Sequence, residues 1–500
     1  MIKYSIKYFT LLLGLLLIFT TSCEDGFTEL NENPNDLSNV EAKNLIAGVQ
    51  AATAHEILYD ANTTFLNMWV QHMAASSYPE EDQYVLRDGD VNNTWNTMYA
   101  RPLQDAQAII DKGSEIGNQQ NVGIGIVMRV IGLAHLTDLF GNIPYSEALK
   151  GSADKGEILI PSYDGQDAVY TGLIQELDEA VTALAGAVSS ADDIGPEDLI
   201  YGGSTSQWIK FATSLKLRLA MTLSNTGKAE AIVSSINMDR LFDSNDDNAK
   251  IVYTDGSNAN PTASHLNSRD QDFRLSKTLV DLMVGAGTAI APEDDRLPVY
   301  ASPNLTDYTD ADGNTITAGG YVGIPNGQNG LGNFYTFDNT SQLGADFLQD
   351  QTPLVFMTYA EVLFLQAEAA MRGWISADAK DLYEKAVKAS MDQHGVDASS
   401  ASVADYLAGS ASYDDASDKL EIIMTQKWIA FFTQGSLAYN DWRRTGIPAL
   451  VPSVNNNNNN LIPRRIPYPT EEFSVNANNV NAAISAQGQA GYNGKVWWDQ

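Results

Sequence analysis

Aromatic rings mixed with amide and carboxylate side chains concentrate in two segments, residues 76–93 and 300–337. A flat ring packs against the apolar C–H face of a sugar, while amides and carboxylates hydrogen-bond its hydroxyls. Both segments are predicted to be loops, and loops on a rigid scaffold commonly carry binding sites, although the same rings could instead pack beneath the loops. We predict a ligand site with the candidate contacts Tyr78, Asp82, Tyr84, Arg87, Asn92, Tyr300, Tyr321, Asn329 and Tyr335.

Sequence patterns typical of enzymes are missing. The five histidines form no His-Glu-x-x-His pattern, and the chain has neither a Walker loop nor a Gly-x-Ser-x-Gly elbow. The segment 310–314 resembles part of a calcium loop, but Gly313 comes too early for an EF-hand, so we expect a hairpin turn. We therefore predict a non-catalytic protein without a metal or cofactor. A glycan hydrolase that uses two acids distant in the sequence stays an alternative.

The first 25 residues predict a membrane anchor. Lys3 and Lys7 precede an apolar run over residues 9–19, and three small residues then precede Cys23, the only cysteine. The run is shorter than the roughly 20 apolar residues that span a bilayer, as in a secretory signal. It resembles a bacterial lipoprotein signal, which implies cleavage after residue 22 and lipid on Cys23, with 23–40 as a tether. An ordinary cleaved signal with an incidental cysteine is the alternative.

The acidic pair Glu24 and Asp25 follows this cysteine. It resembles the signal by which Bacteroides-type bacteria send lipoproteins to the cell surface. We therefore expect a lipid-anchored protein of the outer membrane that faces the cell exterior.

The charge of the chain limits its partners. With 30 basic and 63 acidic residues, the net charge is −33. A field of this sign repels nucleic acid and anionic lipid, so we expect no polyanionic partner. Because Cys23 is assigned to lipid, no disulfide and no cysteine-based zinc site can form within one chain. Stability must come from the apolar core, which a chain of this length can build.

Helical periodicity dominates much of the sequence. Amphipathic patterns predict helices over residues 41–58, 63–75, 94–112 and 166–188, and a dense apolar run predicts a buried helix over 122–140. Similar helices with small residues at their crossings recur near Tyr359 and Leu382. Since one helical hairpin cannot bury its own apolar face, such pairs predict stacked hairpins. The fold class we predict is mainly α, with a tetratricopeptide-like helical hairpin scaffold.

Residues 245–350 have a different composition. They are rich in Gly, Asn, Asp and Tyr and contain the turn signals Asp255-Gly256 and Asp312-Gly313. We predict long loops and short β-hairpins that form a ligand-binding face on the helical scaffold. Residues 41–500 are thus expected to be a single domain with this insert, and the asparagine tract 455–460 is expected to be a mobile loop.

Several sequence motifs point together to one family. They are Trp95 and Tyr99, Arg129 through Phe140 with Gly141 and Pro144, Tyr359 with Glu361 and Glu368, Gln434-Gly435 with Asp441 to Arg444, and Arg464-Arg465-Ile466-Pro467 with Glu471 and Glu472. In this combination the chain resembles the SusD/RagB family of nutrient-binding outer-membrane lipoproteins over nearly its whole length. Most of these residues are expected to build the scaffold. In particular, Arg129, Glu361 and Glu368 should be partly buried and paired, because an unpaired buried charge is costly.

The resemblance implies a SusD-like protein of the cell surface that captures oligosaccharides and delivers them to a SusC-like TonB-dependent transporter. It implies no catalysis by this chain. The expected partners are the transporter, the oligosaccharide and the membrane, the last through lipid on Cys23. An oligopeptide ligand on the same architecture stays open, and so does a helical-repeat scaffold that binds only proteins.

Overall fold

The computed structural model describes residues 41–151, 156–285, 287–488 and 491–500. Ala42–Gln500 forms one compact unit, separate from Met1–Glu41. The predicted signal peptide, Cys23 and the tether lie outside the described residues.

A long helical segment opens the unit. The helix α3 (Ala42–Ala54) continues through π-helical turns, η2 (His55–Asp60) and η3 (Asn62–Leu66), into α4 (Asn67–Trp69). Gln71 then adopts a φ of 60°, which a helix cannot accommodate, and the chain enters the short strand β1 (Met73–Ala75). The predicted helix over 63–75 therefore ends early, because its last residues pair with another strand.

The next helical segment carries the first helix of a stacked row. It runs from α5 (Asp88–Met98) through η4 (Tyr99–Leu103) into α6 (Gln104–Ile116), so it begins six residues before the predicted position. Trp95 in this segment is buried against Phe140 and Tyr468, which confirms a core position for that motif.

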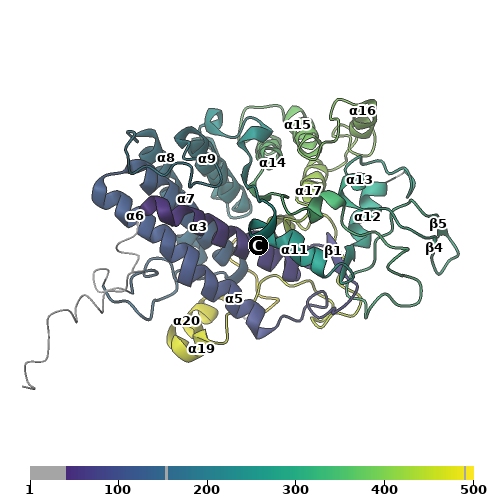
Figure 1. Ribbon diagram of the computed structural model, residues 1–500, viewed down its shortest axis with the longest axis horizontal. Coiled ribbons are helices and arrows are strands. Elements are labelled where there is room, and N and C mark those ends of the chain that lie inside the picture. Colours follow the sequence, from purple (N-terminus) through teal and green to yellow (C-terminus); the bar gives the residue numbers. More distant parts are fainter. Residues whose placement is uncertain (1–40, 152–155, 286, 489–490) are drawn as a thin grey trace, which may run out of the picture. The chain divides into compact units, whose positions relative to one another are not determined.

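Three further helices follow α6 as successive neighbours (Figure 1). They are α7 (Gln119–Phe140) and α8 (Gln166–Ala185), whose ends lie within three residues of the predicted bounds, and α9 (Thr205–Thr222). Within the described residues, α7 is the one helix long and apolar enough to cross a bilayer, and its residues are mostly buried inside the unit. The row is therefore built around an apolar central helix.

The row continues after the loop-rich region. The helix α14 (Tyr359–Met371) packs against α9 and pairs with α15 (Ala379–Asp392), and α17 (Lys419–Ala430) covers both (Figure 1). Ala360, Ala367, Ala386 and Ala389 lie buried in the core that these helices share. Small side chains let helices approach closely. The predicted scaffold of helical hairpins is confirmed.

Buried ion pairs tie this row together. Glu361 of α14 accepts from Arg218 of α9 at 2.6 Å, and Glu368 of α14 accepts from Arg444 at 2.6 Å. Arg444 belongs to α18 (Gly435–Thr445). Arg129 likewise pairs with Glu176 at 2.8 Å. The expectation that these residues are at least partly buried and paired is confirmed, since both glutamates of α14 are buried and Arg129 is partly buried.

The region 245–350 consists of loops, short helices and two-residue to four-residue strands. Three antiparallel pairs form: β1 with β3 (Phe273–Leu275), β2 (Ala249–Ile251) with β6 (Leu354–Met357), and β4 (Tyr308–Thr309) with β5 (Thr315–Ile316). The predicted hairpin turn lies between β4 and β5, where Gly313 has a φ of 87°.

The remaining short helices are α10 (Ala229–Ser235), α11 (Pro261–Ser268), α12 (Lys277–Val284), α13 (Leu297–Tyr300), α16 (Ala401–Ala408), α19 (Glu472–Val475) and α20 (Ala477–Gln487).

The Glu368–Arg444 pair yields a stability prediction. Burial alone would raise the pKa of Glu368, but Arg444 beside it holds that pKa below its ordinary value. The substitution Glu368→Gln removes the buried carboxylate that pairs with both Arg444 and Arg372, leaves Asp441 as the acid beside Arg444, and should lower the free energy of unfolding by about 3 kcal/mol. Urea-induced unfolding measures this. The matched variant Asp381→Asn removes an exposed ion pair with Lys385 and should cost less than about 1 kcal/mol. Equal losses in the two variants would contradict the prediction.

Candidate ligand-binding face

The two predicted ligand loops meet at Asp82. Its buried carboxylate accepts hydrogen bonds from the backbone N–H of Ala75 at 3.1 Å and of Gly327 at 2.8 Å, and from Asn326 Nδ2 at 2.8 Å. Burial raises the pKa of Asp82 to about 6, although these hydrogen bonds act in the opposite direction. One side chain thus joins β1, the first loop and the second loop.

A third loop completes the arrangement, and it contains the asparagine tract. Asn457 N donates to Gln83 O at 2.9 Å, and Asn455 Nδ2 donates to Gly327 O at 3.1 Å. Gln83 Nε2 in turn donates to Asn329 Oδ1 at 2.8 Å. In place of the expected mobile loop, the tract makes specific hydrogen bonds to both other loops. We refer to residues 76–87, 326–340 and 453–460 as the three-loop face.

Tyr78 is the most exposed ring of this face. Its side chain is 67% exposed, and the guanidinium of Arg269 lies 5.6 Å from the ring centroid. Arg269 lies equally close to Phe273 of β3, so it bridges the loop and the strand. A cation beside a ring fixes the orientation of the ring while leaving the other ring surface open.

A row of rings extends from this point over the neighbouring helices. Phe273 lies 6.2 Å from His265 of α11, and His265 lies 5.6 Å from Tyr59 of η2. Tyr59 Oη and His265 Nδ1 are 3.2 Å apart. None of these three residues was predicted from the sequence as a contact, although His265 and Phe273 lie in the predicted loop-rich region 245–350, because they meet Tyr59 from a segment 206 residues earlier than His265.

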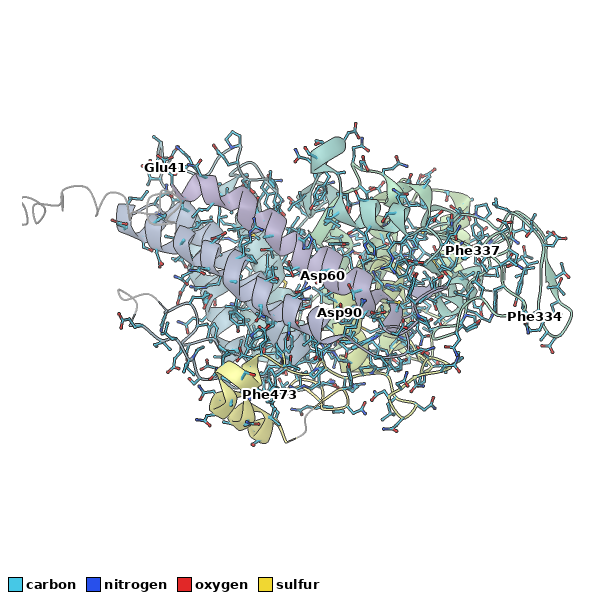
Figure 2. The ribbon with its side chains drawn as sticks, turned by 60° about the horizontal axis from the view of Figure 1, so that its bottom comes forward. Glu41, Asp60, Asp90, Phe334, Phe337 and Phe473 are labelled. Carbon is cyan, nitrogen blue, oxygen red and sulfur yellow. The ribbon has the colours of Figure 1, made fainter. Side chains whose placement is uncertain are left out.

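A second aromatic group lies in the loop 326–340 and the β4–β5 hairpin. Tyr335 stacks on Tyr308 with ring centroids 5.1 Å apart. Phe334 and Phe337 are 49% and 38% exposed, and Figure 2 shows both at the same end of the unit. Arg274, buried beneath, lies 5.0 Å from the Phe337 ring. Phe334 and Phe337 belong to the predicted loop 300–337, although they are not among the nine candidate contacts.

Four of the predicted contact residues are buried and therefore do not present their side chains to a ligand. They are Asp82, Tyr84, Tyr300 and Tyr321. Asp82 holds the loops together, Tyr84 Oη accepts from Ser453 N at 2.9 Å, and Tyr300 stacks on Phe432 at 4.5 Å. Asp82 and Tyr84 thus connect the loops of the face from the inside.

The other predicted contacts lie at or near the surface. Arg87 is exposed and forms ion pairs with Glu81 and Asp90, at 2.7 and 3.2 Å. Asn92 is partly buried within α5. Asn329 is exposed beside Gln83, and Tyr335 is half-buried in its stack. The face thus presents rings, amides and one arginine, and the described residues contain no group of acids and histidines arranged to hold a metal ion.

This combination of rings and amides on loops above a helical scaffold matches a known family. The family model described as "Starch-binding associating with outer membrane" matches residues 34–469. The chain belongs to the SusD-like family. It is thus an outer-membrane nutrient-binding protein of a non-catalytic family, and the prediction that it is not an enzyme is confirmed.

Solved structures agree with this family assignment. A chitin-binding protein is 28% identical with a TM-score of 0.80, and the match covers 92% of this chain and 100% of that one. A chitin-binding SusD homologue from Flavobacterium johnsoniae is 28% identical with a TM-score of 0.73, covering 91% and 98% of the two chains. A SusD-like protein, Bacteroidetes AC2a, shares the fold at 23% identity, with a TM-score of 0.78 and coverage of 92% and 100%. No curated protein sequence matches the chain significantly.

The buried Asp82 yields a prediction for the pH dependence of stability. In the folded SusD-like chain its carboxyl keeps its proton up to a pKa of about 6, whereas in the unfolded chain it loses the proton near the ordinary value of 3.8. The stabilisation that comes from protonated Asp82 is therefore lost as the pH rises from 3.8 towards 6. Above pH 6, this group causes no further change in the free energy of unfolding. Between pH 5 and pH 7, the free energy of unfolding should fall by about 1 kcal/mol more in the wild type than in Asp82→Asn. Urea unfolding across this range measures the difference, and parallel profiles of the two proteins would contradict the assignment.

Proposed function

We propose that this protein is a lipid-anchored SusD-like protein of the cell surface that captures an oligosaccharide on the three-loop face. The observation that carries the proposal is the exposed ring of Tyr78, fixed by Arg269 and lying on a loop that is hydrogen-bonded to two others. An aromatic ring held at a surface among amides suits the apolar face and the hydroxyls of a sugar.

The arrangement favours an oligomer over a single sugar. The rings are distributed over the β1–β3 ribbon, α11 and the second loop, so several units of a chain can find contacts at once. We propose oligomers of N-acetylglucosamine as the ligand class. Two of the structures most similar to this chain are named as chitin-binding proteins, each at 28% identity.

The proposal includes delivery to a partner. The predicted lipid on Cys23 would hold the chain at the outer membrane, with which the family is described as associating. A non-catalytic binding protein there must pass its ligand on intact. We propose a SusC-like TonB-dependent transporter as the recipient.

Calorimetric titration with chitohexaose tests the ligand assignment. We expect saturable binding without cleavage, and Tyr78→Ala and Phe334→Ala should each weaken it about tenfold, since stacking of an aromatic ring contributes roughly 1 kcal/mol or more. Maltohexaose and a hexapeptide serve as comparison ligands.

The matched control is Phe473→Ala. Phe473 is a ring of similar exposure on α19, away from Phe334 and Phe337 (Figure 2), so its removal should leave the affinity unchanged. Tighter binding of the hexapeptide than of either sugar would contradict an oligosaccharide ligand, and an unchanged affinity in both face variants would contradict the site.

A further inference from the structure

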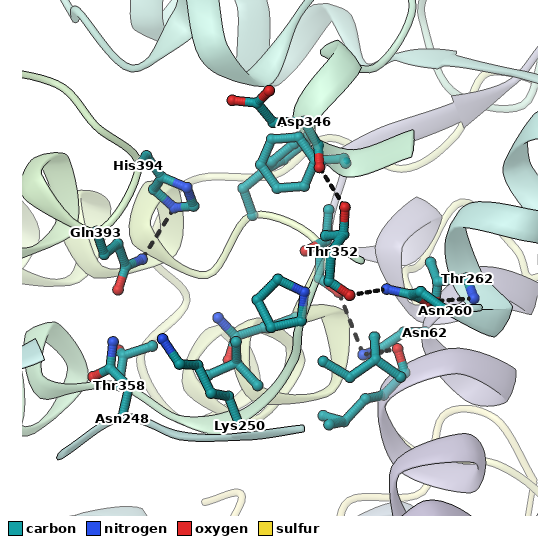
Figure 3. Close-up of a pocket in the computed structure, with 18 of the residues that line it drawn as sticks. Asn62, Asn248, Lys250, Asn260, Thr262, Asp346, Thr352, Thr358, Gln393 and His394 are labelled. Atoms are coloured by element: carbon teal, nitrogen blue, oxygen red, sulfur yellow. Dashed lines mark hydrogen bonds between the residues drawn. The ribbon is translucent and has the colours of Figure 1, made fainter. Parts of the chain in front are cut away.

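A cavity of about 240 Å³ lies apart from the three-loop face. The strands β2 and β6 line it, together with α11, η9 (Ala345–Leu348), the end of α15 and the turn at 432–434. None of its lining residues belongs to the three-loop face. Figure 3 shows side chains from these separate elements around one common space.

Lys250 of β2 and Asp346 of η9 are the two charged residues of the lining, and they form no ion pair with each other. Within the described part of the chain, the amine of Lys250 makes no ion pair and no hydrogen bond, although several other lysines of this strongly acidic protein have an acidic partner. Lys216 and Lys427, for example, lie 2.7 and 2.8 Å from carboxylate oxygens. An amine without an anion at a cavity wall suits a ligand that supplies the anion.

Two amide groups of the lining are also without an acceptor among the described residues. Asn248 Oδ1 accepts from Tyr359 N at 2.6 Å, but Asn248 Nδ2 donates to no group of the protein. The same holds for Gln434 Nε2. Together with Lys250, these groups offer three donors to oxygen atoms of a ligand.

Hydrogen-bond acceptors are unpaired as well. Thr262 Oγ1, Gln393 Oε1 and Gln434 Oε1 are buried without a partner in the described protein. A buried polar atom without a partner is costly, so a ligand with hydroxyl groups would relieve that cost after small side-chain rotations. An inorganic phosphate or sulfate ion lacks enough donors for this purpose.

One wall of the cavity is aromatic and uncharged. The Phe347 ring lies 5.0 Å from Phe432 and 5.8 Å from His394. Burial lowers the pKa of His394 to about 4, and Arg296 acts in the same direction, so the imidazole is neutral at pH 7. The positive charge of the site therefore comes from Lys250, and the rings can pack against the C–H face of a sugar.

We propose that this cavity binds a single hexuronate, with the sugar carboxylate at Lys250 and its hydroxyls at the amides and Thr262. The volume of about 240 Å³ is large enough for one sugar ring. The inference does not depend on the oligosaccharide proposed for the three-loop face.

The test compares sugars that differ at one carbon. Titration of the full chain with sodium glucuronate and galacturonate, at constant ionic strength, should show saturable binding of at least one. Glucose and galactose, which carry CH₂OH in place of the carboxylate, should bind about tenfold more weakly or not at all, because they leave Lys250 without an anion.

Four variants test the position of the site. Lys250→Met keeps the aliphatic stem and should remove the preference for the acid, whereas Lys388→Met, at an exposed lysine that does not line the cavity, should retain it. Thr262→Val should weaken hexuronate binding, and it serves as the second probe if Lys250→Met fails to fold. Tyr78→Ala should leave the hexuronate affinity unchanged. The hexuronate proposal for the cavity and the oligosaccharide proposal for the three-loop face can therefore fail independently of each other. No binding of either acid by the wild type at about 50 mM, or equal binding by Lys250→Met, would overturn the proposal.

Discussion

The fold depends on the pairing of two carboxylates that α14 carries into the interior. Glu361 and Glu368 are almost completely buried and lie seven residues apart, about two helical turns, so they share one face of the helix. A buried carboxylate without a partner would cost several kcal/mol. Arg218 meets the first and Arg444 the second, and these two arginines come from helices far apart in the chain. The pairs therefore fix α9 and α18 on α14, and Lys427 and Asp441 extend the second pair into a network.

This rigid frame positions loops that have little regular structure of their own. The three-loop face contains only short strands, so its shape depends on side-chain hydrogen bonds. Asp82 is central, because its two oxygens accept from β1 and from the second loop at once. Its raised pKa reflects the cost of burying the carboxylate, and the backbone N–H donors offset part of that cost. Tyr84 and the asparagine tract link the third loop in the same way.

The protein thus presents two environments that suit different ligands. The three-loop face is open, with exposed rings and amides, and its extent suits an oligomer that needs contacts along its length. The cavity at β2 and β6 is small and carries one amine without an acid partner among the described residues. The chain has a net charge of −33, and the resulting field opposes the approach of anions. The amine of Lys250 therefore has to outweigh this repulsion by its attraction at short range.

The sequence by itself determined the helical scaffold and the family. Apolar periodicity located α7 and α8 to within three residues, because burial on one or more faces of a helix leaves a pattern that local spacing records. It also indicated that Glu361 and Glu368 would be paired, since an acid among apolar neighbours needs a cation. It predicted candidate ligand loops that contain Tyr78 and Asn329, because rings mixed with amides in turn-rich segments are visible in the chain. Only the tertiary structure decided which of those side chains face outward. Tyr84 and Tyr300 lie in predicted loops, as Tyr78 does. They are nevertheless buried by contacts with Ser453 and Phe432, which lie more than 100 residues away in the chain. The partners of Tyr78, and the meeting of Lys250 with Gln434 around one cavity, likewise depend on long-range packing that no local pattern encodes.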